Sequence, residues 1–278
     1  WSVLVAAKPV TVDAWWSAWT DPAVAPASWL VRAEHLEPAA RVLVSESILY
    51  PREYNEANVG GTVSLMEAMR DAGVRRVVFT SSGAVYGEQA HQPVREDQIP
   101  NPQSPYAVSK LAAEYYVRTI GALWGIETVI TRIFNAYGPG QHLPPSHPPV
   151  VPRFLQQALR GGSLVIFGGG AQTRDFVYVD DVVDALMAAA TASDVDRRTI
   201  NVGSGQETSV NELAALVAGV VGREVEILHS PAESGGVSHL RADISLARRL
   251  LDYDPQIDLE QGLRYTLERD PRFRGKTA

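Results

Sequence analysis

The sequence contains no cysteine among its 278 residues. This absence excludes a disulfide framework, a zinc site built from thiolates and a cysteine nucleophile. No uncharged run of 18 apolar residues is present, which argues against a membrane-spanning helix. The formal net charge of −7 gives no support for nucleic-acid binding, although it is compatible with a local basic pocket for a phosphate-bearing ligand. With 45% hydrophobic residues, the chain can bury a sizeable core in one large or two smaller domains.

The N-terminal segment also lacks glycine, because the first glycine in the chain is Gly60. Prolines break up most of this segment, and a strand is expected only within residues 2–7. Nothing there combines a basic region, an apolar core and a small-residue cleavage site, so we expect a cytoplasmic protein. Organised patterns begin near Tyr54.

A hydroxyl cluster and a helix start follow one another in the first organised part. Residues 75–79 are predicted to form a short buried strand, which places Ser81 and Ser82 at its carboxyl end. Open α/β sheets gather their ligands at this edge. Ser104 followed by Pro105 is typical of a helix start, with a capping hydroxyl and then a proline at the first helical position.

Tyr106 and Lys110 are four residues apart on this predicted helix, which we expect to end near Trp124, so their side chains point to the same side. A free phenol has a pKa near 10, and an ammonium one turn away moves that pKa toward neutrality. The arrangement is typical of a tyrosine used as a general base or acid, with a serine hydroxyl holding the substrate oxygen. A lone Tyr–Lys pair is more often a solvated helix face, so the interpretation depends on the neighbouring motifs.

The later patterns alternate between strands and helices. A buried strand at 127–132 makes a β-α-β unit with the preceding strand and helix. We expect helices at 151–160, at about 180–190 with Asp180 or Asp181 as the cap, and from a Ser209/Glu212 capping box to Val221. Strands are expected at 163–167 and 224–228. The predicted fold class is therefore α/β, with a doubly wound, Rossmann-like parallel sheet and a smaller C-terminal α+β lobe.

Three further segments accompany the Tyr106–Lys110 pair in order. They are Asn58-Val59-Gly60-Gly61-Thr62, Arg132-Ile133-Phe134-Asn135-Ala136-Tyr137-Gly138-Pro139 and Arg174-Asp175-Phe176-Val177-Tyr178-Val179-Asp180-Asp181. Together with Ser81-Ser82-Gly83-Ala84-Val85-Tyr86-Gly87, they resemble the extended short-chain dehydrogenase/reductase family. The resemblance is to its NAD-dependent sugar-nucleotide epimerase branch, of which UDP-glucose 4-epimerase is the best-known type. It covers the chain from about Tyr54 to the C-terminus.

The resemblance implies a role for each residue of the cluster. Tyr106 would be the catalytic base, and Lys110 would bind the nicotinamide ribose of NAD and lower the pKa of the tyrosine. Ser82 would hydrogen-bond the reacting sugar hydroxyl, with Ser81 as the neighbouring alternative. Asn58 would lie at the base of the site. We expect Asn58 to be structural rather than catalytic. Asn58 and Ser81 are both predicted to belong to the cofactor-binding part of the site.

The resemblance also implies contacts to the nucleotide sugar. Asn135 would reach the diphosphate or the sugar, although bonding to its own turn is an equal alternative. Arg174 would clamp a phosphate, against the alternative of an ion pair with the next aspartate. Glu233 and Gly236 stand where family members commonly carry an arginine and an acidic residue. Arg241 would substitute for that arginine, or else anchor the following helix.

The implied reaction is NAD-dependent epimerisation at C4 of a sugar nucleotide of the UDP-glucose/UDP-galactose type, by transient oxidation to a keto sugar. The implied assembly is a homodimer formed through the Tyr106 helix and the helix before it. Related 4,6-dehydratases carry an acidic pair after the serine and decarboxylating enzymes carry a glutamate, whereas this chain has Gly83 and Ala84. Another oxidoreductase of the family remains an alternative. No metal is expected, because His142 and His147 lack a third ligand.

A dinucleotide-binding domain should open with a strand, a glycine fingerprint and an acidic residue, and this chain does not. It could be a truncated or gapped part of a longer protein, or residues 1 to about 45 could be out-of-frame translation. A third interpretation is a non-catalytic sugar-nucleotide-binding protein that has lost the cofactor loop. We favour the first two because the downstream motifs are retained. The expected domains are 1–137, completed by about 175–203, for the dinucleotide, and mainly 138–174 and 204–278 for the substrate.

Overall fold

The structure is a computed structural model that describes residues 4–6, 40–145, 148–231 and 236–274. The principal elements in chain order are β1 (Leu4–Ala6), α2 (Val44–Leu49), α3 (Pro51–Asn55), a π-helical turn (Glu56–Gly60), α4 (Gly61–Asp71), β2 (Arg76–Ser82), a 3₁₀ turn (Gly83–Tyr86), α5 (Pro105–Trp124), β3 (Glu127–Ile133), β4 (Asn135–Tyr137), α6 (Val150–Leu159), β5 (Leu164–Phe167), β6 (Thr173–Arg174), β7 (Phe176–Tyr178), α7 (Val179–Thr191), β8 (Arg198–Val202), β9 (Thr208–Ser209), α8 (Val210–Val221), β10 (Ile227–Ser230), α9 (Ser245–Leu251) and α10 (Leu259–Arg269).

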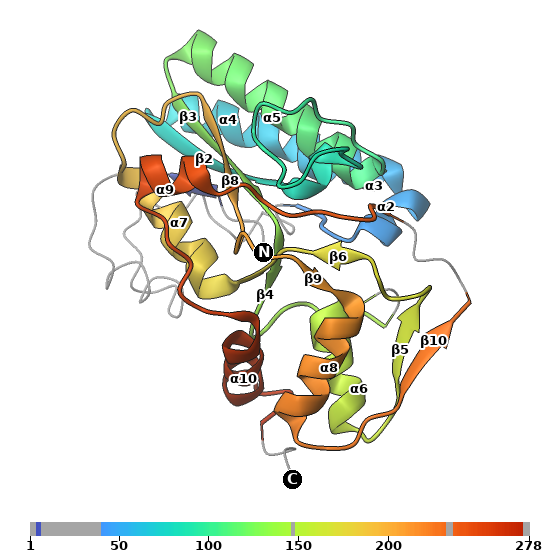
Figure 1. Cartoon of the computed structure of the whole chain (residues 1–278). Coiled ribbons are helices and arrows are strands. Elements are labelled where there is room, and N and C mark those ends of the chain that lie inside the picture. Colours follow the sequence, from blue (N-terminus) through green and yellow to red (C-terminus); the bar gives the residue numbers. More distant parts are fainter. Residues whose placement is uncertain (1–3, 7–39, 146–147, 232–235, 275–278) are drawn as a thin grey trace.

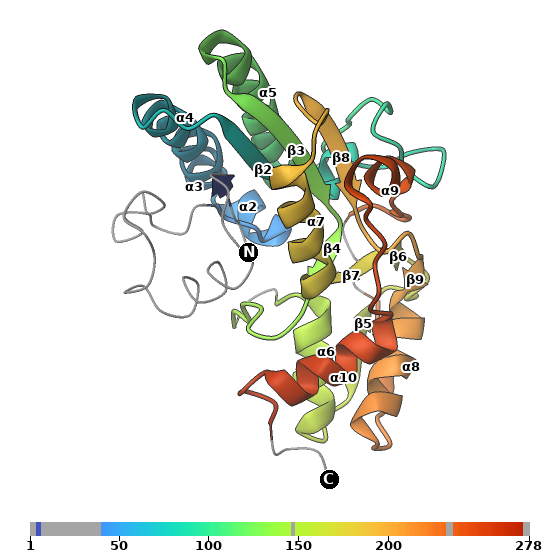
Figure 2. The same cartoon turned by 90° about the vertical axis from the view of Figure 1, so that its left-hand side faces the viewer.

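The largest sheet has the strand order β1-β2-β3-β8, and Figure 1 labels β2, β3 and β8. Strands β2, β3 and β8 run parallel, and β1 pairs antiparallel with β2 at the edge. Successive side chains of β2 enter different cores, because neighbouring residues of a strand point to opposite faces. Val77 and Phe79 pack in a cluster with residues of α4 and α5, whereas Val78 packs with residues of α7 and α9. Figure 2 shows these two helix pairs on the two sides of the sheet. The predicted α/β class with parallel strands is confirmed.

A second core lies beside the sheet and is built mainly from α6, α8 and α10 (Figure 1). Phe154, Leu213 and Leu263 are fully buried in it. The short parallel pair β4–β7 leads the chain from the sheet toward this core, and β5 pairs in parallel with β10 at its far side. The segment from Leu240 to Tyr253 instead packs with the sheet core.

Local signals fix the helix ends that matter for the site. The Ser104 hydroxyl accepts a hydrogen bond from the Ala107 amide at 3.1 Å, Pro105 is the first residue of α5, and Gly125 ends the helix in the left-handed region at φ 68°. The predicted capping box is confirmed, since Ser209 and Glu212 bond each other's backbone amides at the start of α8.

Two predictions about local structure were wrong. Neither aspartate caps α7, which begins at Val179 without a side-chain cap. The Asp181 carboxylate instead accepts hydrogen bonds from the amides of Gln256 and Ile257, so its oxygens are engaged by a distant segment. The strand expected at 224–228 is β10, Ile227–Ser230, because its pairing register with β5 starts at Ile227.

None of the helices in the described part of the chain is long and apolar enough to cross a lipid bilayer. The same residues contain no group of three histidine or acidic side chains that could hold a metal ion.

Candidate active site

Tyr106 and Ser82 meet where the carboxyl end of β2 faces the first turn of α5. Tyr106 is 8% exposed, and Ser82 is the polar side chain near enough to its hydroxyl to lower the pKa of the phenol. The extended backbone of Ser82 ends the strand, and its hydroxyl also accepts from the Ala84 amide at 3.2 Å. Burial raises the pKa of Tyr106, and the Ser82 hydrogen bond lowers it part of the way back. The net direction is opposite to the lowering that the family resemblance implied.

Lys110 lies one turn further along α5 and is 4% exposed. Its Nζ lies 4.8 Å from the centre of the Phe79 ring, a cation–π contact. Among the described residues it makes no hydrogen bond. Burial lowers the pKa of Lys110 to about 8, and the negative charge of Glu114 opposes that shift. The ammonium therefore keeps hydrogen-bond donors for a ligand.

The two serines at the end of β2 have different partners. Ser81 donates to the Glu114 carboxylate at 2.5 Å and is buried. Glu114 is also held by Arg132 through two hydrogen bonds of 3.0 and 2.8 Å. The Ser81 hydroxyl is thus used within the protein, and Ser82 is the serine that faces Tyr106.

The Asn58 side chain connects α5 to the segment that precedes α2. Its side-chain amide donates to the Ser109 hydroxyl at 2.8 Å, and that hydroxyl donates to the Tyr106 carbonyl oxygen at 2.8 Å. Its other contacts are to the backbone of Arg41, through the amide at 2.8 Å and the carbonyl at 3.1 Å. The Tyr54 ring packs edge-on against the Tyr106 ring, with the ring centres 6.4 Å apart.

Arg174 is not paired with Asp175, which removes the alternative role considered for it. The buried Asp175 carboxylate accepts from Ser204 and from the amides of Gly205 and Ala242. Arg174 donates to the Thr173 carbonyl at 2.6 Å, and burial lowers its pKa against the charge of Glu88.

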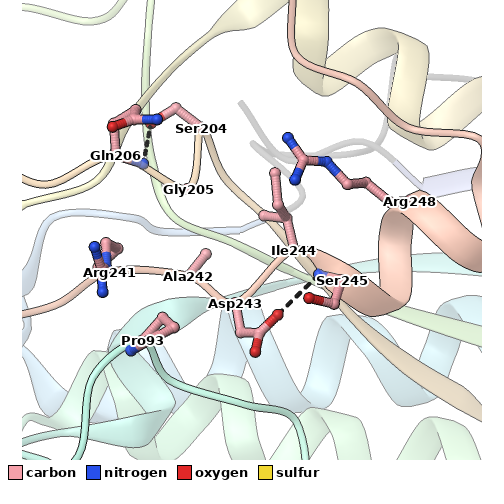
Figure 3. Close-up of a pocket in the computed structure, with 10 residues that line it drawn as sticks. All are labelled: Pro93, Ser204, Gly205, Gln206, Arg241, Ala242, Asp243, Ile244, Ser245 and Arg248. Atoms are coloured by element: carbon pink, nitrogen blue, oxygen red, sulfur yellow. Dashed lines mark hydrogen bonds between the residues drawn. The ribbon is translucent and has the colours of Figure 1, made fainter.

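Asn135 is exposed, and within the described residues its side chain makes no hydrogen bond to its own turn. Arg241 lies apart from the Tyr106 cluster, in a cavity of about 270 Å³ that also involves Arg248, Asp243 and Ser204 (Figure 3). The backbone of Arg241 is fixed by Gln92 and Val94, and Asp243 of the same segment accepts a hydrogen bond from the Ser245 amide at the start of α9. His147 and Glu233 lie outside the described residues.

Several residues that shape the site were not predicted from the sequence. Glu114 follows Lys110 by four residues, and Arg132 opens one of the motifs, so helical spacing and motif membership were the available signals. Ser109 and Tyr54 had no such signal, because their roles depend on tertiary contacts.

Residues 34–203 match the model of the NAD dependent epimerase/dehydratase family. UDP-glucose 4-epimerase of Mycolicibacterium smegmatis is 42% identical over 231 residues, which cover 83% of this chain and 73% of that protein.

Two solved structures are also similar. UDP-glucose 4-epimerase of Thermotoga maritima with UDP-glucose has a TM-score of 0.78 and 35% identity, over 82% of this chain and 74% of that one. UDP-glucuronic acid 4-epimerase of Bacillus cereus with UDP-glucuronic acid and NAD has a TM-score of 0.76 and 31% identity, over 83% and 73%. The chain therefore belongs to the NAD-dependent epimerase/dehydratase family.

Proposed function

We propose that this chain epimerises C4 of a nucleotide-diphosphate sugar of the UDP-glucose/UDP-galactose type, by transient oxidation to a keto sugar. The observation that carries the proposal is that Tyr106 and Lys110 are both buried on α5, with Ser82 at the end of β2 near the Tyr106 hydroxyl. Gly83 and Ala84 follow the serine and have no carboxyl group, which speaks against elimination of water and against decarboxylation. The names of the similar 4-epimerases support the choice of carbon.

In the proposed mechanism, Tyr106 as the phenolate takes the proton of the sugar C4 hydroxyl while C4 is oxidised. Tyr106 returns the proton to the sugar oxygen when C4 is reduced again. Ser82 holds the reacting oxygen. Because burial disfavours the phenolate, Tyr106 needs a nearby positive charge, and Lys110 supplies it from one turn away. NAD, when bound, supplies the hydride acceptor and donor for the carbon.

The residues present fit the nicotinamide ribose half of NAD. Lys110 is buried, and its ammonium makes no hydrogen bond to any described residue, so it suits the hydroxyls of a nicotinamide ribose beside Tyr106. Residues 1–59 contain no glycine, so none of them forms a glycine loop for the diphosphate. Asn58 and Ser81 would support the cofactor site indirectly. Asn58 bonds Ser109 of α5, and Ser81 bonds Glu114.

For the substrate, we propose Arg174 as a diphosphate contact and the exposed Asn135 as a sugar or diphosphate contact. A half-buried guanidinium that is not paired with the adjacent aspartate suits a phosphate. Arg241 remains a second phosphate candidate only for a ligand that extends into its separate cavity. The proposed division is a cofactor domain of 1–137 completed by about 175–203, with 138–174 and 204–278 mainly on the substrate side.

We also propose a homodimer through α5 and the neighbouring α4. Val108, Tyr115 and Leu123 on α5 are 52%, 62% and 75% exposed, and their spacing puts them on one helix face. Solution scattering should give the mass of a dimer for the wild type and of a monomer for Leu123→Glu. A monomeric wild type would contradict this part of the proposal.

The activity is tested with purified protein supplied with NAD and, in turn, UDP-galactose, UDP-glucuronate and UDP-N-acetylglucosamine. Inversion at C4 is followed by proton NMR, and bound NAD is measured after release from the protein. We expect inversion with UDP-galactose. Inversion with UDP-glucuronate alone would replace the proposed substrate, and nucleotide-sugar binding without NAD or inversion would favour a non-catalytic binding protein.

A further inference from the structure

The Glu114 carboxylate is the centre of a buried polar group that the proposed mechanism does not use. Its oxygens accept hydrogen bonds from Ser81 on β2 and from Arg132 on β3. Glu114 is 2% exposed, and Ser81 and Arg132 are 5% and 4% exposed. Such a pair is shielded from solvent, so its charges act on their neighbours with little screening.

Lys110 is the neighbour that matters, because Glu114 follows it by one helical turn on α5. The charged and titratable groups around this corner are Tyr106 and Glu114 from α5, Arg132 from β3, Tyr86 from the 3₁₀ turn, Tyr54 from α3 and Glu96, whose charge acts on Tyr86 and Arg132. Strand β2 contributes hydroxyls and the Phe79 ring. The negative charge of Glu114 opposes the lowering of the Lys110 pKa by burial. A buried lysine without such a carboxylate loses its proton readily.

We propose that Glu114 is a positioning residue that keeps Lys110 in its ammonium form, and that Arg132 sets how much of the negative charge Lys110 experiences. The importance of this for turnover rests on the proposed function, in which Lys110 supports the Tyr106 phenolate. The same carboxylate fixes Ser81, so it also joins the end of β2 to α5.

The lysine content makes the protonation of Lys110 measurable without any turnover. The chain has three lysines, Lys8, Lys110 and Lys276. Lysine labelled with ¹³C at Cε therefore gives few side-chain NMR signals, and Lys110→Met assigns the one of interest. A pH titration of that signal reports the Lys110 pKa directly.

The decisive variant is the double replacement Glu114→Gln with Arg132→Met, which removes the carboxylate without leaving the Arg132 guanidinium buried and unpaired. We expect it to lower the Lys110 pKa by about one unit or more, and Arg132→Met alone to raise it. Glu127→Gln is the matched control. It removes a carboxylate from the Arg76–Glu127 pair at the opposite end of β3, and should leave the Lys110 pKa unchanged.

Unchanged Lys110 titration in the double variant would overturn the inference. If that variant does not fold, the wild type decides, because a Lys110 pKa well below 7 with Glu114 in place would also overturn it. As the pH is raised, kcat of the double variant should fall at a lower pH than kcat of the wild type, because Lys110 loses its proton earlier. A shifted Lys110 pKa in a protein without epimerase activity would instead contradict the proposed function and leave the role of Glu114 standing.

Discussion

Asn58 is connected to α5 through Ser109, whose hydroxyl lies 2.8 Å from the Asn58 side-chain nitrogen and 2.8 Å from the Tyr106 carbonyl oxygen. The π-helical turn that carries Asn58 is therefore tied to the first turn of α5. The position of the Tyr106 backbone depends on this buried chain of hydrogen bonds as well as on the Ser104 cap.

Replacing Asn58 by alanine should lower the free energy of unfolding by about 2 to 3 kcal/mol, because buried partners on Ser109 and Arg41 lose their bonds. Ser109→Ala, which leaves the Arg41 bonds intact, should cost about 1 kcal/mol. Urea unfolding measures both. Equal stability of Asn58→Ala and the wild type would show that this chain of bonds contributes nothing.

Lys110→Met should stabilise the protein while removing activity. Burial lowers the pKa of Lys110 from 10.5 to about 8, so at pH 7 the native state holds an ammonium in an unfavourable environment. Removing it should raise the free energy of unfolding by about 3 kcal/mol at pH 7. Destabilising functional groups of this kind are common in active sites.

The sign of the pH dependence follows from the same shift. Between pH 8 and 10.5 the unfolded chain binds more protons at Lys110 than the native chain, so the stability of the wild type rises with pH in this window. The advantage of Lys110→Met should be complete below pH 8 and gone by about 10.5. A constant advantage across this window, measured by urea unfolding at each pH, would rule out the buried ammonium as its cause.

Arg174→Gln should raise KM for the nucleotide sugar about tenfold to a hundredfold and change kcat little, since a charged hydrogen bond to phosphate is lost. Arg249→Gln, at an exposed arginine on α9, is the control and should leave both constants unchanged. Steady-state kinetics separate the two constants. A KM equal to that of the wild type would remove Arg174 from the phosphate site.

Local signals predicted much of the frame of the site. Ser104 and Pro105 mark the start of α5, and the apolar run before Ser81 marks β2, because a cap and a strand depend on neighbouring residues. The pairing of Glu114 with Arg132 was not predictable in this way, since it joins a helix to a strand through the tertiary fold.

The errors have the same origin. Asp181 was expected to cap its helix, but its carboxylate binds amides 75 and 76 residues further along the chain. Burial raises the pKa of Tyr106, and this burial depends on tertiary packing that the spacing of Tyr106 and Lys110 does not reveal.

The most direct test of the account is the rate of C4 inversion of UDP-galactose by Tyr106→Phe with NAD supplied. The change removes one hydroxyl and keeps the ring, so the variant should fold and bind substrate while kcat falls about a hundredfold to ten-thousandfold. Tyr265→Phe, on the distant helix α10, should keep the wild-type rate. A Tyr106→Phe protein that inverts C4 as fast as the wild type would contradict the central claim.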